Sequence, residues 1–145
     1  MAARTKARKR ALDVLFEADQ RGINVGQHLD ARIAESGSQT PLPEYSVEIV
    51  RGVLARWVEI NAIIADASEE WTIDRMPAVD RNLLRIATWE MLLNDEVSVA
   101  VAIDEAIELA RDLSTDDSPR FMNGVLGRIA REAPALGSDE VDREV

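Results

Sequence analysis

The amino-acid sequence predicts an all-α protein made of two small packed helical bundles with about six to seven helices. Apolar residues recur at spacings of three and four along nearly the whole chain, and the alternating β-branched runs typical of strands are missing. Hydrophobic residues make up 46% of the 145 residues, which is enough to form a buried core.

The first half of the chain has three predicted helices, over residues 4–20, 25–35 and 44–67. Each has an apolar stripe at helical spacing, and Leu29 and Ile33 are expected to face inward in the second helix. Gly22 and Gly26 interrupt the pattern after the first helix, and the loop sequence SGSQTPLP separates the second from the third. The following segment EEWTIDRMPAVD contains a proline and loses the period, which predicts the boundary between the two bundles.

The second half also has three predicted helices, over residues 79–94, 99–113 and 120–132. Ser98 is expected to cap the helix that follows it, and Ser118 with Pro119 behind it is typical of a helix start. The pattern as a whole predicts one domain over residues 1–137, with sub-bundles at about 1–70 and 76–137. An acidic flexible tail is expected over residues 138–145.

Basic residues are concentrated at the start of an acidic protein. The formal net charge is -10, yet the first ten residues contain five cations and no acid, and they include both lysines of the chain. A helix N-terminus disfavours cations because the macrodipole is positive there. This basic segment (Arg4, Lys6, Arg8, Lys9 and Arg10) therefore predicts a local contact with a polyanion. The alternative is a solvated segment that binds nothing.

Groups suited to catalysis are few. Cysteine is absent and His28 is the only histidine, which excludes thiolate metal sites and zinc sites built on two histidines. The segment AIDEAIELARD (residues 102–112) places carboxylates at helical spacings but lacks the Glu-x-x-His motif of di-iron bundles. We interpret it as a solvated face, with Glu108 paired to Arg111 or Arg131. We expect no enzymatic activity, no cofactor and no metal.

The sequence also predicts a cytoplasmic location without membrane contact. No apolar run approaches the roughly 20 residues that cross a bilayer. Asp13, Glu17 and Asp19 interrupt the stretch that would be the apolar part of a signal peptide.

A second candidate site lies at the start of the last predicted helix. Arg120 and Phe121 combine a cation with an aromatic ring, as in sites that stack unpaired bases. A plain core position for Phe121 is the alternative that the pattern alone favours. Gly124 within a helix costs about 1 kcal/mol relative to alanine, so we expect close packing or backbone approach there.

Three segments together resemble the NusB family of transcription antitermination factors from end to end. They are the basic opening R-x-K-A-R-K-R-A-L-x-V-L-F, the stretch D-R-N-L-L-R-I-A-x-W-E-M-L from Asp80 to Leu92, and V-A-I-D-E-A-I-E-L-A-R followed by S-x-R-F-M-N-G-V-L. The resemblance implies a non-enzymatic role in binding the boxA segment of ribosomal RNA leader transcripts together with the ribosomal protein NusE. The complex supports read-through by RNA polymerase, and hence ribosomal RNA synthesis.

The resemblance also assigns roles to individual residues. It implies RNA contacts at Arg4, Lys6 and Arg8, extended here by Lys9 and Arg10, and at Arg120 and Phe121 near the same surface. Asp80 matches an acidic position on the protein-partner face, and some family members form homodimers. Thr5 stands where the family often has another arginine. A helical protein-interaction module without direct RNA contact remains the alternative function.

Overall fold

The computed structural model describes residues 2–35, 41–133 and 136, and within these residues the chain is helical with no strand. The elements are α1 (Ala3–Arg21), α2 (Val25–Ala34), α3 (Glu44–Ala55), α4 (Trp57–Ala67), the short 3-10 helix η1 (Ile73–Arg75), α5 (Ala78–Leu93), α6 (Val99–Leu113) and α7 (Ser118–Glu132). The all-α prediction is confirmed. The predicted tail over residues 138–145 lies outside the described residues.

Most predicted helix boundaries hold, and two need correction. The Ser98 side chain accepts a hydrogen bond from the Val101 amide, as expected for the cap of α6. The single long helix predicted over residues 44–67 is wrong, because Arg56 leaves helical geometry (φ -125°, ψ 34°) and separates α3 from α4. The N-cap of α7 is Asp117 rather than Ser118, which is already the first helical residue.

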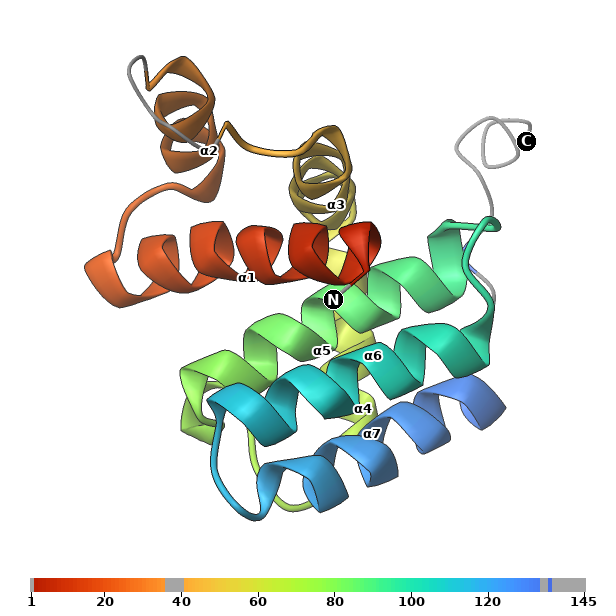
Figure 1. Ribbon diagram of the computed structural model, residues 1–145. Helices are drawn as coiled ribbons and strands as arrows, with labels where there is room; N and C mark the ends of the chain where they lie inside the picture. The colour runs from red at the N-terminus through yellow and green to blue at the C-terminus, as the bar shows by residue number, and fades with distance from the viewer. Residues whose placement is uncertain (1, 36–40, 134–135, 137–145) are drawn as a thin grey trace, which may run out of the picture.

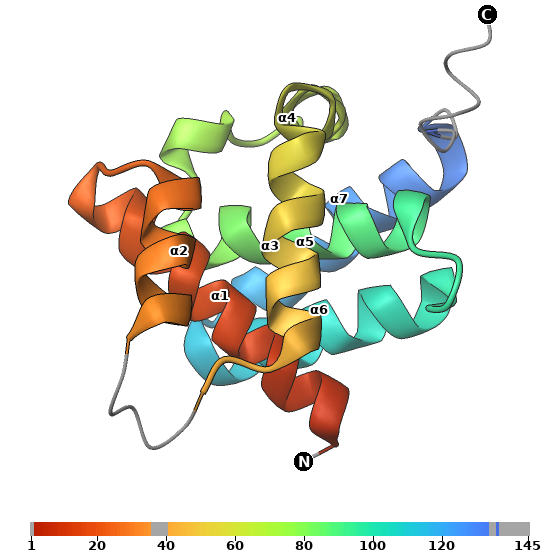
Figure 2. The same ribbon diagram turned by 90° about the horizontal axis from the view of Figure 1, so that it is seen from above.

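Helix α1 lies between two groups of helices. It packs against α2 and α3 on one side and α5 on the other, while α5, α6 and α7 run side by side (Figure 1). Figure 2 shows α3 leading from the N-terminal part of α1 towards α4. Helix α4 packs against α5 and α7, and the predicted sub-bundle boundary between residues 70 and 76 stays a prediction.

One connected core joins both groups, with α5 at its centre. Residues 82–91 of α5 are all buried, which is the pattern of a helix covered on every side. Leu15 from α1, Ile49 from α3 and Leu126 from α7 pack into the same core. Ile33 was predicted to face inward but is 46% exposed, because only the Leu29 side of α2 packs against the rest of the protein.

Asp19 joins α1 to α5 through hydrogen bonds. Its two carboxylate oxygens accept from Arg81 Nε and Nη2, at 2.7 and 2.8 Å, and Asn82 Nδ2 donates to one of them at 3.0 Å. The hydrogen bonds from Arg81 hold the pKa of Asp19 below its usual range. Because of this lowered pKa, the stabilisation that the α1–α5 contact provides depends on pH.

We predict that Asp19 contributes to acid unfolding. Its folded pKa is lower than its unfolded pKa, so its stabilising contribution is full above the unfolded value near 4. The contribution is lost as pH falls through the folded pKa. Asp19→Asn should lower the free energy of unfolding at pH 7 by about 1 kcal/mol, and the loss should shrink towards pH 3. Urea unfolding at both pH values tests this, and an equal loss at both would contradict it.

Candidate nucleic-acid interface

The basic segment forms the first two turns of α1, and the helical period divides its cations between two faces. Successive residues turn by about 100°, which places Arg4 and Arg8 on one face. Lys6, Lys9 and Arg10 lie around the opposite face. Lys6 and Lys9 are exposed and Arg10 is half-buried, whereas Arg8 is only 4% exposed. The five cations therefore do not form one continuous surface.

Arg8 lies inside the protein in a cluster of charged and polar groups. Its Nε donates to both carboxylate oxygens of Glu90, at 3.0 and 2.9 Å, and its Nη1 donates to Glu105 at 3.2 Å. The Arg8 and Glu90 side chains are 5% and 1% exposed. The Tyr45 hydroxyl also donates to Glu90, and burial together with this carboxylate raises the pKa of Tyr45.

The RNA contact expected of Arg8 stays a prediction, and this placement gives the residue a structural role as well. Both carboxylates that face its guanidinium come from α5 and α6, so the arginine joins α1 to these helices. Nε and Nη1 of Arg8 are engaged by these carboxylates, and its side chain is only 5% exposed. In this structure Arg8 is therefore a residue that positions the basic segment.

Arg4 lies at the edge of the same cluster and is partly accessible. Its side chain is 43% exposed, and its Nη2 donates to Glu96 at 2.9 Å. Its guanidinium also lies over the Tyr45 ring, 4.3 Å from the centroid. One residue along, the Thr5 hydroxyl donates to Glu105 at 2.7 Å. The inner face of the basic segment is thus paired with acidic side chains of the body.

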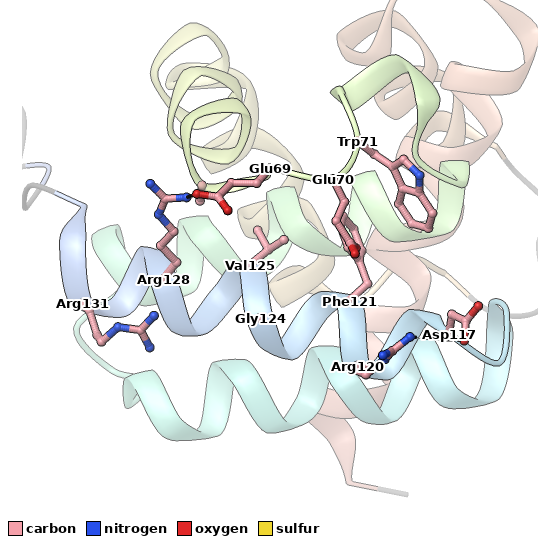
Figure 3. Close-up of a pocket in the computed structure, with 11 residues that line it drawn as sticks. Glu69, Glu70, Trp71, Asp117, Arg120, Phe121, Gly124, Val125, Arg128 and Arg131 are labelled. Carbon is pink, nitrogen blue, oxygen red and sulfur yellow. Dashed lines mark hydrogen bonds and ion pairs between the residues drawn. The ribbon is translucent and has the colours of Figure 1, made fainter.

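Arg120 and Phe121 lie at the start of α7, beside a cavity of about 710 Å³. The Arg120 side chain is 87% exposed, but Phe121 is 8% exposed and its ring packs against Trp71 with centroids 4.7 Å apart. Figure 3 shows Glu69 and Arg128 meeting at one end of this cavity, while Arg120 lies at the other. Phe121 is therefore a core residue, as the alternative expected, and also lines the cavity wall.

The expectation of close packing at Gly124 is wrong. A Cβ atom added there would meet no atom within 4 Å, because the residue faces the open cavity.

Arg4 and Arg120 lie near opposite ends of α6, while Thr5 and Arg8 contact Glu105 in the middle of that helix. Arg4 contacts Glu96 just before α6 begins, whereas Arg120 follows the turn after α6 ends. The 15 residues of α6 span about 21 Å at 1.5 Å per residue. The structure therefore does not bring Arg120 and Phe121 next to the basic segment.

Asp80 is buried and serves a structural contact. It is 0% exposed, and its carboxylate oxygens accept hydrogen bonds from Ser114 Oγ at 2.6 Å and Ser118 Oγ at 2.8 Å. The carboxylate thereby joins the start of α5 to the turn between α6 and α7. Asp80 is fully buried in this structure, and its predicted place on the protein-partner face stays a prediction.

Comparison with known proteins places this arrangement in a family. The model of the NusB family matches residues 5–131. The chain belongs to the NusB family. The transcription antitermination protein NusB of Beutenbergia cavernae is 51% identical over 97% of both chains, and that of Salinispora tropica is 57% identical over 92% of this chain and 98% of its own.

Solved NusB structures share the fold. NusB of T. maritima superposes with a TM-score of 0.78 at 34% identity, covering 92% of this chain and 94% of its own. A structure of the antitermination factors NusB and NusE in complex with dsRNA gives a TM-score of 0.75 at 27% identity, covering 88% of this chain and 96% of that one. Membership of the NusB family makes this chain a transcription antitermination factor and not an enzyme.

The described part of the chain holds neither a metal-binding cluster nor a membrane-spanning helix. Over residues 2–35, 41–133 and 136, no three or more His, Asp or Glu side chains gather in a way that could hold a metal ion. Over the same residues, none of the helices combines the length and the apolar character that crossing a membrane requires.

Sequence reasoning missed several residues that contact the basic segment. Glu90 and Glu105 pair with Arg8, and the ring of Tyr45 lies under the guanidinium of Arg4. Neither local composition nor periodicity links these positions to the N-terminus. Glu105 lies in the segment interpreted as a solvated face, which its contact with Arg8 corrects. In the same segment Glu108 does pair with Arg111, as predicted.

Proposed function

We propose that this chain binds the single-stranded boxA segment of ribosomal RNA leaders and acts with the ribosomal protein NusE in the RNA polymerase antitermination complex. One observation carries the proposal. Lys6 and Lys9 form an exposed cationic face at the start of α1, on a chain that matches the NusB family over residues 5–131. The related structure of NusB and NusE in complex with dsRNA supports this choice of partners.

The chemistry of the exposed face suits an RNA backbone. Lysine ammonium groups and arginine guanidinium groups both neutralise phosphates, and arginine adds forked hydrogen bonds. The net charge of -10 repels RNA at long range, so binding depends on this local face. We assign the contacts with the RNA backbone to Lys6, Lys9 and Arg10. The partly exposed Arg4 lies at the edge of this face and adds a further contact.

Arg120 remains a candidate for a separate contact. Its guanidinium extends from the start of α7 next to the cavity whose wall contains Trp71 and Phe121. Cations beside aromatic rings suit unpaired bases. Because this region lies about 21 Å along α6 from the contact between Arg4 and Glu96, one RNA strand would need several nucleotides to reach both.

The proposal predicts the effect of neutralising the exposed lysines. Lys6→Ala combined with Lys9→Ala should weaken binding of a boxA oligonucleotide about ten-fold at 0.15 M salt, because two phosphate contacts are lost. The folded state should be unaffected, since both side chains are exposed. A fluorescence titration of labelled RNA, with and without NusE, measures the affinities.

Arg21→Ala is the matched control for this titration. Arg21 is an exposed cation in the last turn of the same helix, far from the basic segment. Its removal should leave RNA affinity within about two-fold. Retention of NusE without any RNA binding would favour the alternative protein-interaction module. The oligomeric state is to be measured in the same samples, because a homodimer stays a prediction.

A further inference from the structure

The ion pairs between the basic segment and the body include two of very different accessibility. The Arg8–Glu90 pair is buried, with side chains 5% and 1% exposed. The Arg4–Glu96 pair is exposed to solvent, with side chains 43% and 72% exposed. Exposed pairs of this kind contribute little and exchange readily with solvent and ions, whereas breaking a buried pair is costly. The Arg4–Glu96 pair can therefore be exchanged without disturbing the fold.

Glu96 is held in position beside Arg4 by its neighbours. The Glu96 backbone amide donates to Asn94 Oδ1 at 3.0 Å, which shapes the turn before α6. Asn94 Nδ2 in turn donates to the hydroxyl of Tyr45 at 3.0 Å, and the ring of Tyr45 lies under Arg4. The turn that presents Glu96 and the ring that supports Arg4 are thus connected by hydrogen bonds.

We propose that Glu96 competes with RNA for Arg4, so that the Arg4–Glu96 pair restrains RNA binding until it opens. This inference rests on the proposed RNA-binding function and adds an autoinhibitory contact to it. The Glu96 carboxylate occupies Nη2 of the Arg4 guanidinium, one of the donors that a phosphate oxygen would use. Arg4 remains over Tyr45 while its partner changes, because the ring contact does not involve the carboxylate.

The competition makes binding depend on several phosphates at once. A single phosphate facing Arg4 must displace a carboxylate that is already tethered nearby. A strand whose other phosphates contact Lys6 and Lys9 raises the effective concentration of phosphate at Arg4. The pair therefore discriminates against small anions and favours a polyanion that covers the outer face of α1.

Glu96→Gln tests this inference directly. The variant keeps the size of the side chain and removes its charge, so it should bind a boxA oligonucleotide about two- to five-fold more tightly than the unmodified chain, the range that a solvent-exposed pair allows. In an Arg4→Ala background the same change should give no gain, because the competing partner is absent. Titrations of the four proteins form a double-mutant cycle.

Glu59→Gln is the control for net charge. Glu59 is 51% exposed and forms an ion pair with Arg56 at the start of α4, beyond the far end of α3. This variant changes net charge equally and should alter affinity less than about two-fold.

The outcomes separate the two proposals. An equal gain in both glutamine variants, or a gain that persists with Arg4→Ala, would overturn the role of Glu96 while RNA binding stands. Absence of RNA binding by all variants and by the unmodified chain would overturn both proposals.

Discussion

Replacing Arg8 by alanine is expected to lower the free energy of unfolding by about 3–5 kcal/mol, the cost of removing one partner of a buried ion pair. Glu90 would lose both hydrogen bonds from Arg8 Nε while remaining 1% exposed, and Glu105 would lose one. The loss arises because an unpaired buried carboxylate is poorly solvated. Urea unfolding followed by circular dichroism measures the change.

The matched variant is Lys6→Ala, two residues earlier on the exposed face of the same helix. It should change the free energy of unfolding by less than about 0.5 kcal/mol. The two variants should thus separate stability from RNA affinity. An Arg8→Ala protein as stable as the unmodified chain would contradict the buried pair and return Arg8 to the exposed RNA-binding face.

Gly52→Ala is expected to destabilise the protein by about 3 kcal/mol, at the upper end of the usual cost of overpacking. An alanine Cβ at this position would lie 2.1 Å from Nε1 of Trp89, which is far inside contact distance. Trp89 is 7% exposed within α5, so its indole has little room to move away. The absence of a side chain at Gly52 therefore allows α3 to approach the Trp89 ring of α5 closely.

Gly124→Ala provides the opposite result in another helix. The added Cβ would meet no atom within 4 Å, so the higher helix propensity of alanine should stabilise α7 by about 1 kcal/mol. Thermal unfolding of both variants measures the contrast. A Gly52→Ala protein with an unchanged melting temperature would show that α3 and α5 do not approach as closely as described.

Local sequence signals were sufficient to predict most of the helices. Ser98 begins α6 because its side chain satisfies an amide of the first turn, and this depends only on neighbouring residues. The break at Arg56 has no such signal, because neither glycine nor proline marks it. It follows from packing between distant segments: α4 packs on α5 and α7, and Arg85 lies over the Trp57 ring at 4.4 Å.

The candidate site was predictable in its charges but not in its partners. The cations of the basic segment are evident in the sequence, and the helical period alone places Arg4 and Arg8 together. Their counter-ions are remote, since Glu90 lies 82 residues from Arg8 and Glu96 lies 92 residues from Arg4. Only the folded arrangement of α1 against α5 and α6 distinguishes buried Arg8 from exposed Lys6. The partners of Asp80 are remote as well, since Ser114 and Ser118 lie at the turn between α6 and α7.

The salt dependence of RNA binding tests the outer face of α1 most directly. If Arg4, Lys6, Lys9 and Arg10 contact phosphates and Arg8 does not, log K should fall against log salt concentration with a slope of roughly -3. Combining Lys6→Ala with Lys9→Ala should reduce the slope to about -1.4. A slope that is the same in both proteins, or close to zero in the unmodified chain, would contradict RNA binding through this face.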